Sequence, residues 1–146
     1  MKKTIIKKYL FLLFAFLLVS ANFIKCGDSG TNPADAEFIL PDSKLTFDEH
    51  ISPMLQAKCG YGSACHSIEN PNNRLDVYTH DLFVNYILST GDRLIDLDNP
   101  PLSPLYLLIT EGFRGIEKMP PARYSRPPLT KNQVDGILQW IKEGAK

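Results

Sequence analysis

After residue 45 the apolar positions recur at helical spacing, beginning with a segment around residue 50. Thr46 and Glu49 have the spacing of a capping box, a hydroxyl at the helix start and a carboxylate three residues on. The apolar residues that follow at helical intervals are Phe47, Ile51, Met54 and Leu55. Pro53 falls within this pattern, so we expect it either to begin the helix or to kink it.

Two further helices are expected in the middle of the domain. One follows Thr79, and its apolar face consists of Leu82, Phe83, Tyr86 and Ile87. The other begins at Ser103-Pro104, where a hydroxyl cap is followed by proline at the first helical position, and it can end at Gly112. Its apolar face consists of Leu105, Leu108 and Ile109.

The last predicted helix has the strongest local signals. Thr130 and Gln133 form a capping box, with Leu129 and Val134 at the staple positions on either side. Its apolar stripe consists of Val134, Ile137, Leu138 and Ile141. Gly144 is suited to the C-terminal stop.

The segments between these helices are long and rich in proline, glycine and asparagine, and no convincing strand pattern is found. Loops of this length usually carry function or are organised by a bound group. A small helical protein with such loops has too few apolar side chains to form a hydrophobic core that organises them. A large apolar cofactor would provide the missing part of that core. We therefore predict an all-α fold, a small helical domain with long loops around one cofactor.

The N-terminus has the pattern of an export signal. Four lysines lie within residues 1–8, and residues 9–24 are almost entirely apolar and uncharged. A basic stretch followed by a short apolar one is typical of a secretory signal peptide, which we assign to residues 1–25. The apolar run is shorter than the ~20 residues of a spanning helix, and an uncleaved membrane anchor is the alternative.

Two routes of signal processing are open. The small residues at 19–21 form a cleavage site that would leave Asn22 first. Cys26 and the polar stretch CGDSGTNP resemble the lipidated cysteine and tether of bacterial lipoproteins. An unpaired exposed thiol is a liability in an oxidising compartment, so we favour lipidation of Cys26 and a polar linker over residues 26–44. The protein would then lie on the periplasmic or cell-surface side, anchored to a membrane.

The chain without its predicted signal peptide has a different net charge from the whole chain. The chain has 16 basic and 16 acidic side chains, but residues 1–25 contain five lysines and no acid, which leaves the remainder with a net charge of −5. An acidic exported domain disfavours nucleic acid as a partner. Residues 45–146 are long enough for one domain with one core.

The candidate chemistry lies in the stretch AKCGYGSACHS. Cys59 and Cys65 are the only cysteines after Cys26, and His66 directly follows the second. Covalent haem attachment needs such an arrangement, because two thiols add to the two vinyl groups of the porphyrin and the adjacent histidine ligates the iron. Five residues separate these cysteines instead of the usual two, so the intervening residues must loop outward.

Two other interpretations of this stretch stay open. A Cys59–Cys65 disulfide would close a small loop in an exported, haem-free binding module. A zinc site is a third interpretation, although few ligands cluster nearby in the sequence.

Met119 is the candidate for the second iron ligand. It lies in the segment Lys118-Met119-Pro120-Pro121, in a long loop ahead of the last helix. A thioether is a soft, neutral ligand suited to haem iron, and methionine opposite histidine raises the reduction potential. Pro120 restricts the backbone of Met119 to the extended region, which stiffens its presentation.

These pieces together resemble the cytochrome c-like domains common in planctomycetes and related bacteria, including standalone lipoprotein forms. The resemblance covers about residues 45–145. The matching pieces are ISPML at 51–55, Lys58-Cys59, Cys65-His66, RLDV at 74–77, SPLY at 103–106, MPP at 119–121, and 129–145 with QWI and GA.

The resemblance implies one haem c, with Cys59 and Cys65 as thioether links, His66 as the proximal ligand and Met119 as the distal ligand. With both axial positions filled, we expect an electron carrier that exchanges electrons with redox protein partners, rather than an enzyme. A haem enzyme would require Met119 to dissociate.

Other residues are weaker candidates for the same site. His50 and His80 are alternative iron ligands, and Arg123 and Arg126 are candidates for pairing with haem propionates. The aromatic side chains that could pack on a porphyrin are Tyr61, Tyr124 and Trp140.

Overall fold

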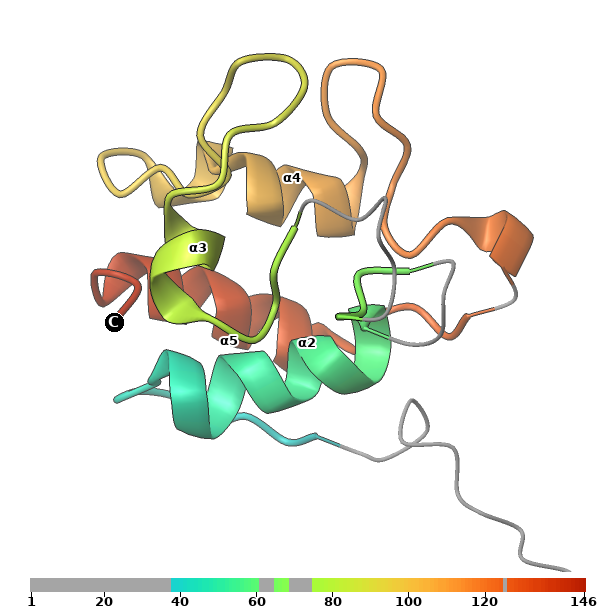
Figure 1. Ribbon diagram of the computed structural model, residues 1–146. Helices are drawn as coiled ribbons and strands as arrows, with labels where there is room; N and C mark the ends of the chain where they lie inside the picture. The colour runs from blue at the N-terminus through green and yellow to red at the C-terminus, as the bar shows by residue number, and fades with distance from the viewer. Residues whose placement is uncertain (1–37, 61–64, 69–74, 125) are drawn as a thin grey trace, which may run out of the picture. The chain divides into compact units, whose positions relative to one another are not determined.

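The computed structural model describes residues 38–60, 65–68, 75–124 and 126–146, all within one compact unit, Asn32–Lys146. In chain order the helices are η2 (Phe47–Ile51), α2 (Ser52–Cys59), α3 (His80–Val84), η3 (Pro100–Leu102), α4 (Pro104–Thr110), η4 (Ala122–Tyr124) and α5 (Lys131–Lys142) (Figure 1). Within the described ranges, β pairing is limited to the isolated bridges Ile87–Arg93 and Phe113–Ile116. The prediction of a small, mainly helical fold is confirmed.

The first helical segment begins where predicted but without the predicted cap. Thr46 is the N-cap of η2, yet its side chain makes no capping hydrogen bond, so the capping box with Glu49 is wrong. The backbone N–H and the hydroxyl of Thr46 instead contact Nδ1 of His50, both at 3.2 Å. The imidazole one turn later thus accepts from the backbone N–H that the Glu49 carboxylate was expected to bind, and it also contacts the hydroxyl that was expected to accept from the Glu49 N–H.

Pro53 lies just after a turn of different hydrogen bonding, in the first turn of the α-helical part of this segment. The turn Phe47–Ile51 is a wide π turn, in which the N–H of Ile51 donates to the carbonyl oxygen of Thr46 at 3.2 Å. The α-helical form starts at Ser52 and places Pro53 in its first turn. Proline is tolerated there because the missing N–H would have no intrahelical partner.

Helix α3 is shorter than its apolar pattern predicts. It starts after Thr79 as expected, but it ends at Val84. Phe83 is completely buried, whereas Leu82 is 58% and Ile87 is 51% exposed. The predicted four-residue apolar face is therefore wrong, because Tyr86 and Ile87 lie beyond the helix end and follow a turn instead.

Helix α4 agrees closely with its sequence signals. Ser103 precedes Pro104, which is the first helical residue, and Leu105, Leu108 and Ile109 are buried. The Ser103 hydroxyl does not cap the helix but donates to the carbonyl oxygen of Leu94 at 3.1 Å. Beyond the helix, Gly112 has a φ of +101°, a conformation that favours glycine.

Helix α5 forms both hydrogen bonds of the predicted capping box between Thr130 and Gln133. Gly144 has a φ of +93° and follows the helix end as expected. The buried face is rotated from the predicted stripe, because Val134 and Leu138 are only partly buried. The side buried in the core consists of Gln133, Gly136, Ile137, Trp140 and Ile141.

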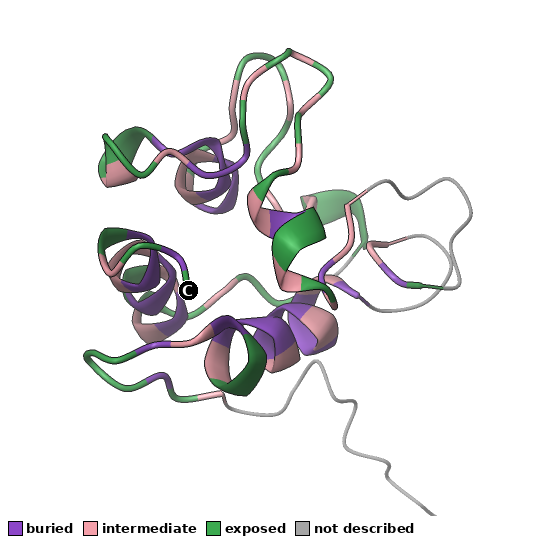
Figure 2. Ribbon diagram, turned by 60° about the vertical axis from the view of Figure 1, so that its left-hand side comes forward, coloured by how far each residue is buried: buried purple, intermediate pink, exposed green. Residues whose placement is uncertain are grey.

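The core is centred on three aromatic side chains from three elements. Trp140 of α5 is completely buried, and its ring centroid lies 6.0 Å from that of Phe47 in η2 and 6.2 Å from that of Phe83 in α3. Figure 2 shows buried residues on the inward faces of the helices and in parts of the connecting segments, whereas the exposed residues lie on the outward faces and along the loops. This cluster joins the two ends of the domain sequence.

Part of the segment predicted as a linker packs against α5. Leu40 is 4% exposed, and its backbone exchanges two hydrogen bonds with the side chain of Asn132, at 2.7 Å and 2.9 Å. The side chain of Leu40 lies directly over Gly136. Residues 38–44 are therefore attached along α5, which a polar linker would not be.

Candidate functional site

The first site residue, Cys59, is the last residue of α2. The helix stops at Gly60, whose N–H lies 2.9 Å from the carbonyl oxygen of Gln56. A Cβ atom at Gly60 would lie 2.7 Å from that same oxygen, so glycine permits the close approach that ends the helix. This local geometry fixes where Cys59 leaves the helix.

His66 is placed beside Cys59 by a backbone hydrogen bond. The N–H of His66 donates to the carbonyl oxygen of Cys59 at 2.9 Å. This bond closes the loop between the two cysteines, of which residues 61–64 lie outside the described residues. Cys59, Cys65 and His66 are thus brought together at the C-terminal end of one helix, as the motif predicts.

Within the described residues, neither Cys59 nor Cys65 is part of a disulfide. Burial of the Cys59 thiol is the main cause that raises its pKa to about 12; the nearby Cys65 adds to the rise, and Lys58 opposes it. Cys59 therefore keeps its proton at neutral pH. A buried neutral thiol is a poor metal ligand, because metals bind the thiolate.

Met119 is held in place by its backbone and by packing. Its N–H donates to the carbonyl oxygen of Leu108 in α4 at 2.7 Å. Its side chain is partly buried and packs against the hydrophobic core, as does the side chain of Cys59. The long loop after α4 is therefore tied to the domain at the residue predicted to ligate.

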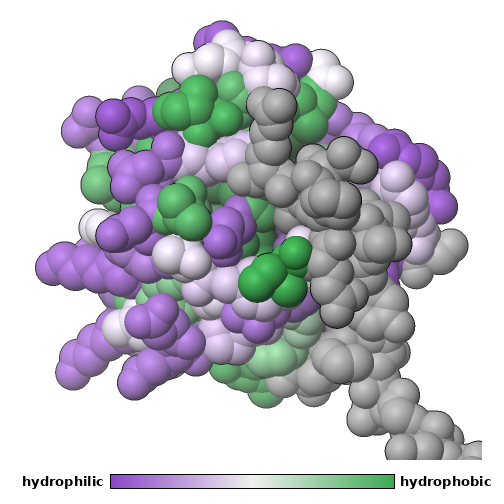
Figure 3. Space-filling model, in the orientation of Figure 1, coloured by the Kyte–Doolittle hydropathy of each residue, from purple (hydrophilic) through white to green (hydrophobic). Residues whose placement is uncertain are grey.

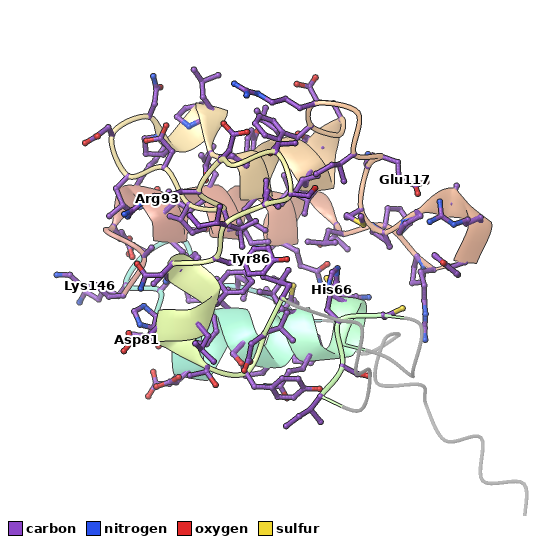
Figure 4. All side chains as sticks on the ribbon, turned by 45° about the horizontal axis from the view of Figure 1, so that its top comes forward. His66, Asp81, Tyr86, Arg93, Glu117 and Lys146 are labelled. Atoms are coloured by element: carbon purple, nitrogen blue, oxygen red, sulfur yellow. The ribbon has the colours of Figure 1, made fainter. Side chains whose placement is uncertain are left out.

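The predicted ligands occupy one end of the domain. Figure 4 shows His66 beside the C-terminal end of α2, on the same side as Glu117, which precedes Met119 by two residues in the loop. Asp81, Arg93 and Lys146 lie toward the opposite side. The structure thus places the cysteine-histidine motif and the methionine loop at the same end.

The two alternative histidine ligands are engaged elsewhere. Nδ1 of His50 contacts Thr46, as described above. Nε2 of His80 lies 2.7 Å from the carbonyl oxygen of Ala145, and Nδ1 lies 3.1 Å from Oδ1 of Asp81. His80 belongs to the end of the domain away from His66, so it does not join the site.

Arg123 also has local partners. It forms an ion pair with Glu117, and its guanidinium lies 4.8 Å from the ring centroid of Tyr124. Tyr124 is 44% exposed. Arg126 is partly buried, and Tyr61 falls outside the described residues.

Trp140 lies in the aromatic core of the domain. Its indole N–H donates to the main-chain oxygen of Lys146 at 2.9 Å, and its ring is surrounded by the aromatic core. Its role in the described fold is that of a core residue.

Lys58 is a feature that the sequence analysis missed. Its side chain is only 8% exposed although it directly precedes Cys59. Ser67, which follows His66, is also buried, at 6% exposed. No periodicity or motif signals this burial, because lysine and serine are normally exposed and only the packing around the motif covers them.

A pocket of about 910 Å³ lies at the other end of the domain. His80, Gly144 and Ala145 form one wall, and residues of the 92–98 segment form another. Nη1 of Arg114 lies 3.3 Å from Oδ2 of Asp92, which joins two loops above the pocket. No local pattern in the sequence predicts this pocket, because its walls come from segments far apart in the chain.

On the face drawn in Figure 3, apolar side chains reach the surface in separate small groups among polar ones.

Across the residues that the structure describes, no three His, Cys, Asp or Glu side chains gather closely enough to hold a metal ion. The same described ranges contain no helix that is both long enough and apolar enough to span a bilayer. The predicted signal, residues 1–25, and Cys26 lie outside them.

No family model matches the chain, and neither a curated protein nor a solved structure is found to match it.

Proposed function

We propose that this chain is an exported c-type cytochrome that carries one covalently bound haem and transfers electrons. The observation that carries the proposal is the hydrogen bond from the His66 N–H to the Cys59 carbonyl oxygen. It brings two cysteines that are not joined in a disulfide and an imidazole to the end of one helix, the set of groups that covalent haem attachment requires.

The residues present fit such a group in their chemistry. A thioether forms when an S–H adds across a vinyl double bond, so each cysteine must be reduced, and no oxidant is consumed. Neither Cys59 nor Cys65 is in a disulfide, and the raised pKa of Cys59 keeps its thiol protonated. An imidazole nitrogen and a thioether sulfur are donors that haem iron accepts, and His66 and Met119 carry these groups.

Each residue would have a separate role. Cys59 and Cys65 would hold the porphyrin, and His66 and Met119 would ligate its iron. The bound haem would supply a one-electron redox couple at a potential that the two ligands set. The protein would hold these two ligands in place and exclude water, which suits electron transfer rather than turnover of a substrate.

The proposal extends to the location of the protein. The basic and apolar N-terminus supports export, and Cys26 supports a lipid anchor on the periplasmic or cell-surface side. The net negative charge of the domain disfavours nucleic acid, so redox proteins are the proposed partners.

The experiment is extraction of the protein purified from its native host with acid and acetone. We expect the colour to stay with the polypeptide, and a tryptic peptide containing Cys59 and Cys65 to carry the mass of one haem. A Cys65→Ser variant should lose one thioether, and a Cys59→Ser variant the other. A colourless protein whose Cys59 and Cys65 are joined by a disulfide would contradict the proposal and support a disulfide-stapled module instead. The disulfide would appear as a peptide mass lower by the two thiol hydrogens.

A further inference from the structure

His80 lies between two acceptors at the start of α3. Its Nε2 atom is 2.7 Å from the carbonyl oxygen of Ala145, and its Nδ1 atom is 3.1 Å from Oδ1 of Asp81. The ring also meets Phe47 edge to face, with centroids 5.4 Å apart and planes at 69°. The imidazole is therefore fixed on three sides.

The proton count decides which form of His80 fits this position. A carbonyl oxygen and an ionised carboxylate can only accept hydrogen bonds, so each ring nitrogen must carry a hydrogen to make its bond. The neutral imidazole has one N–H, and only the imidazolium has two. On deprotonation, His80 either loses the bond to Ala145 or turns a lone pair toward the Asp81 carboxylate.

The bond to Ala145 holds a turn that has an unusual backbone. Gly144 and Ala145 are consecutive residues with φ values of +93° and +50°, and the second is not glycine. Such a conformation is disfavoured for alanine and needs support from its surroundings. The N–H of Ala145 donates to the carbonyl oxygen of Trp140 at 3.0 Å, and His80 binds the other side of the same residue.

We propose that His80 is a pH-sensitive latch that fastens the C-terminal turn at Gly144 and Ala145 to α3 when it is protonated. The latch weakens when the imidazole loses a proton. His80, Gly144 and Ala145 together form one wall of the 910 Å³ pocket. That wall should therefore be more mobile when His80 is deprotonated. This inference is independent of haem.

The charges around His80 favour the protonated form. The bond to the Ala145 carbonyl oxygen is the largest cause that raises the pKa of His80; Asp81 and Asp48 of η2 also raise it, and partial burial opposes them. The charged residues of the pocket walls are Asp92, Arg93, Asp96, Asp98 and Arg114, and Lys146 follows the turn. Figure 4 shows Asp81, Arg93 and Lys146 toward the same side of the domain.

The sign of the pH dependence follows from the raised pKa. The latch is complete below the ordinary histidine pKa of 6.5 and weakens as the pH rises through the higher value of the folded state. Loss of one net hydrogen bond should make opening of the turn about three- to tenfold more frequent.

The test is amide hydrogen exchange of the full chain at pH 5.5 and pH 8.5, corrected for the intrinsic rates. We expect the protection of Ala145 and of the α3 amides to fall about three- to tenfold at the higher pH. Asp81→Asn is the informative variant, because the Asn side-chain amide can donate to Nδ1 while Nε2–H keeps the bond to Ala145. That variant should stay protected at both pH values.

His50→Gln is the matched control, since it removes another histidine of the same domain and should leave the pH dependence intact. Equal protection of the wild type at both pH values would overturn the proposal. So would an Asp81→Asn variant that still loses protection at pH 8.5. A titration of His80 by nuclear magnetic resonance needs no variant, and a midpoint below 6.5 would also overturn it.

Discussion

The backbone N–H of Met119 donates to the carbonyl oxygen of Leu108, at 2.7 Å, and so fixes a long loop to helix α4. Leu108 is buried in the core and lies in a helix that the sequence signals locate well. The position of the proposed distal ligand therefore depends on α4 rather than on the loop that contains it.

Replacing Met119 with leucine should separate ligation from packing. Leucine has a similar volume and apolar character, so the free energy of unfolding should change by less than about 1.5 kcal/mol. It has no sulfur, so in the proposed cytochrome the weak far-red sulfur-to-iron absorption should vanish and the reduction potential should fall. Spectroscopy and a redox titration measure these changes.

Met119→Ala is the companion variant, because it removes both the sulfur and the packing. It should additionally increase the mobility of residues 113–128, which hydrogen exchange can detect. If Met119→Leu leaves the spectrum and the potential unchanged, Met119 is not the ligand. Rapid cyanide binding by the wild type would mean that the sixth position is open and would favour a haem enzyme.

Gly136→Ala should destabilise the protein, although alanine normally strengthens a helix interior. A Cβ atom at position 136 would lie 2.5 Å from Cδ1 of Leu40 and 2.9 Å from its Cβ. We expect a loss of about 1–3 kcal/mol in urea unfolding, as for an overpacked core. Leu40→Ala removes the nearer atom, so the Gly136→Ala penalty should shrink in that background. Additive effects of the two changes would show that residues 38–44 do not pack on α5 in solution.

Glu143 should contribute to stability above its titration range and lose that contribution in acid. Its carboxylate accepts hydrogen bonds from the Gln139 side chain at 2.9 Å and from the backbone N–H groups of Leu45 at 2.8 Å and Lys44 at 3.0 Å. The Gln139 bond is the largest cause that lowers the pKa of Glu143 below its usual 4.5, and the Leu45 bond follows. Stability from this group is therefore full above about pH 4.5 and falls as the pH drops through the lower, folded-state value.

Urea midpoints between pH 6 and pH 3 can check this dependence. Glu143→Gln should be less stable than the wild type at pH 6 and should approach it at pH 3. Gln139→Ala removes the leading partner, so its acid-induced loss should begin at a higher pH than that of the wild type. A constant difference between Glu143→Gln and the wild type at every pH would argue against this assignment.

Cys26→Ser should release the protein from the membrane if a lipid at Cys26 is the anchor. One acyl chain binds a bilayer only marginally, and stable attachment needs at least two. Fractionation of the native host reports the distribution of the variant, and the mass of the mature N-terminus reports the lipid. Continued membrane association of the variant would instead favour an uncleaved N-terminal helix.

Local signals in the sequence located the helix ends well where the deciding groups are close in the chain. Thr130 and Gln133 form their capping box, and Gly112 and Gly144 take the positive φ that ends a helix. The pattern failed around residues 82–87, because the apolar residues there do not belong to one helix. At Thr46 a competing partner, His50, occupied the groups of the expected cap.

For the candidate site, the sequence predicts the motif residues but not the tertiary contacts that hold them. The sequence predicts Cys59, Cys65, His66 and Met119 as a set, and this stays a prediction; in the structure the motif and the methionine loop lie at one end of the domain. It did not identify the burial of Lys58 or the tie from Met119 to Leu108, since both depend on segments that meet only after folding.

By itself the sequence determined the helical class and the caps of the last helix, because each depends on residues within a few positions of one another. Only the tertiary structure decided that Leu40 packs on Gly136, that Trp140 joins Phe47 and Phe83, and that His80 meets Ala145. These contacts join residues that are distant in the chain. Local periodicity holds no information about which of many apolar or polar surfaces will meet, and that choice follows from how the helices fill one shared core.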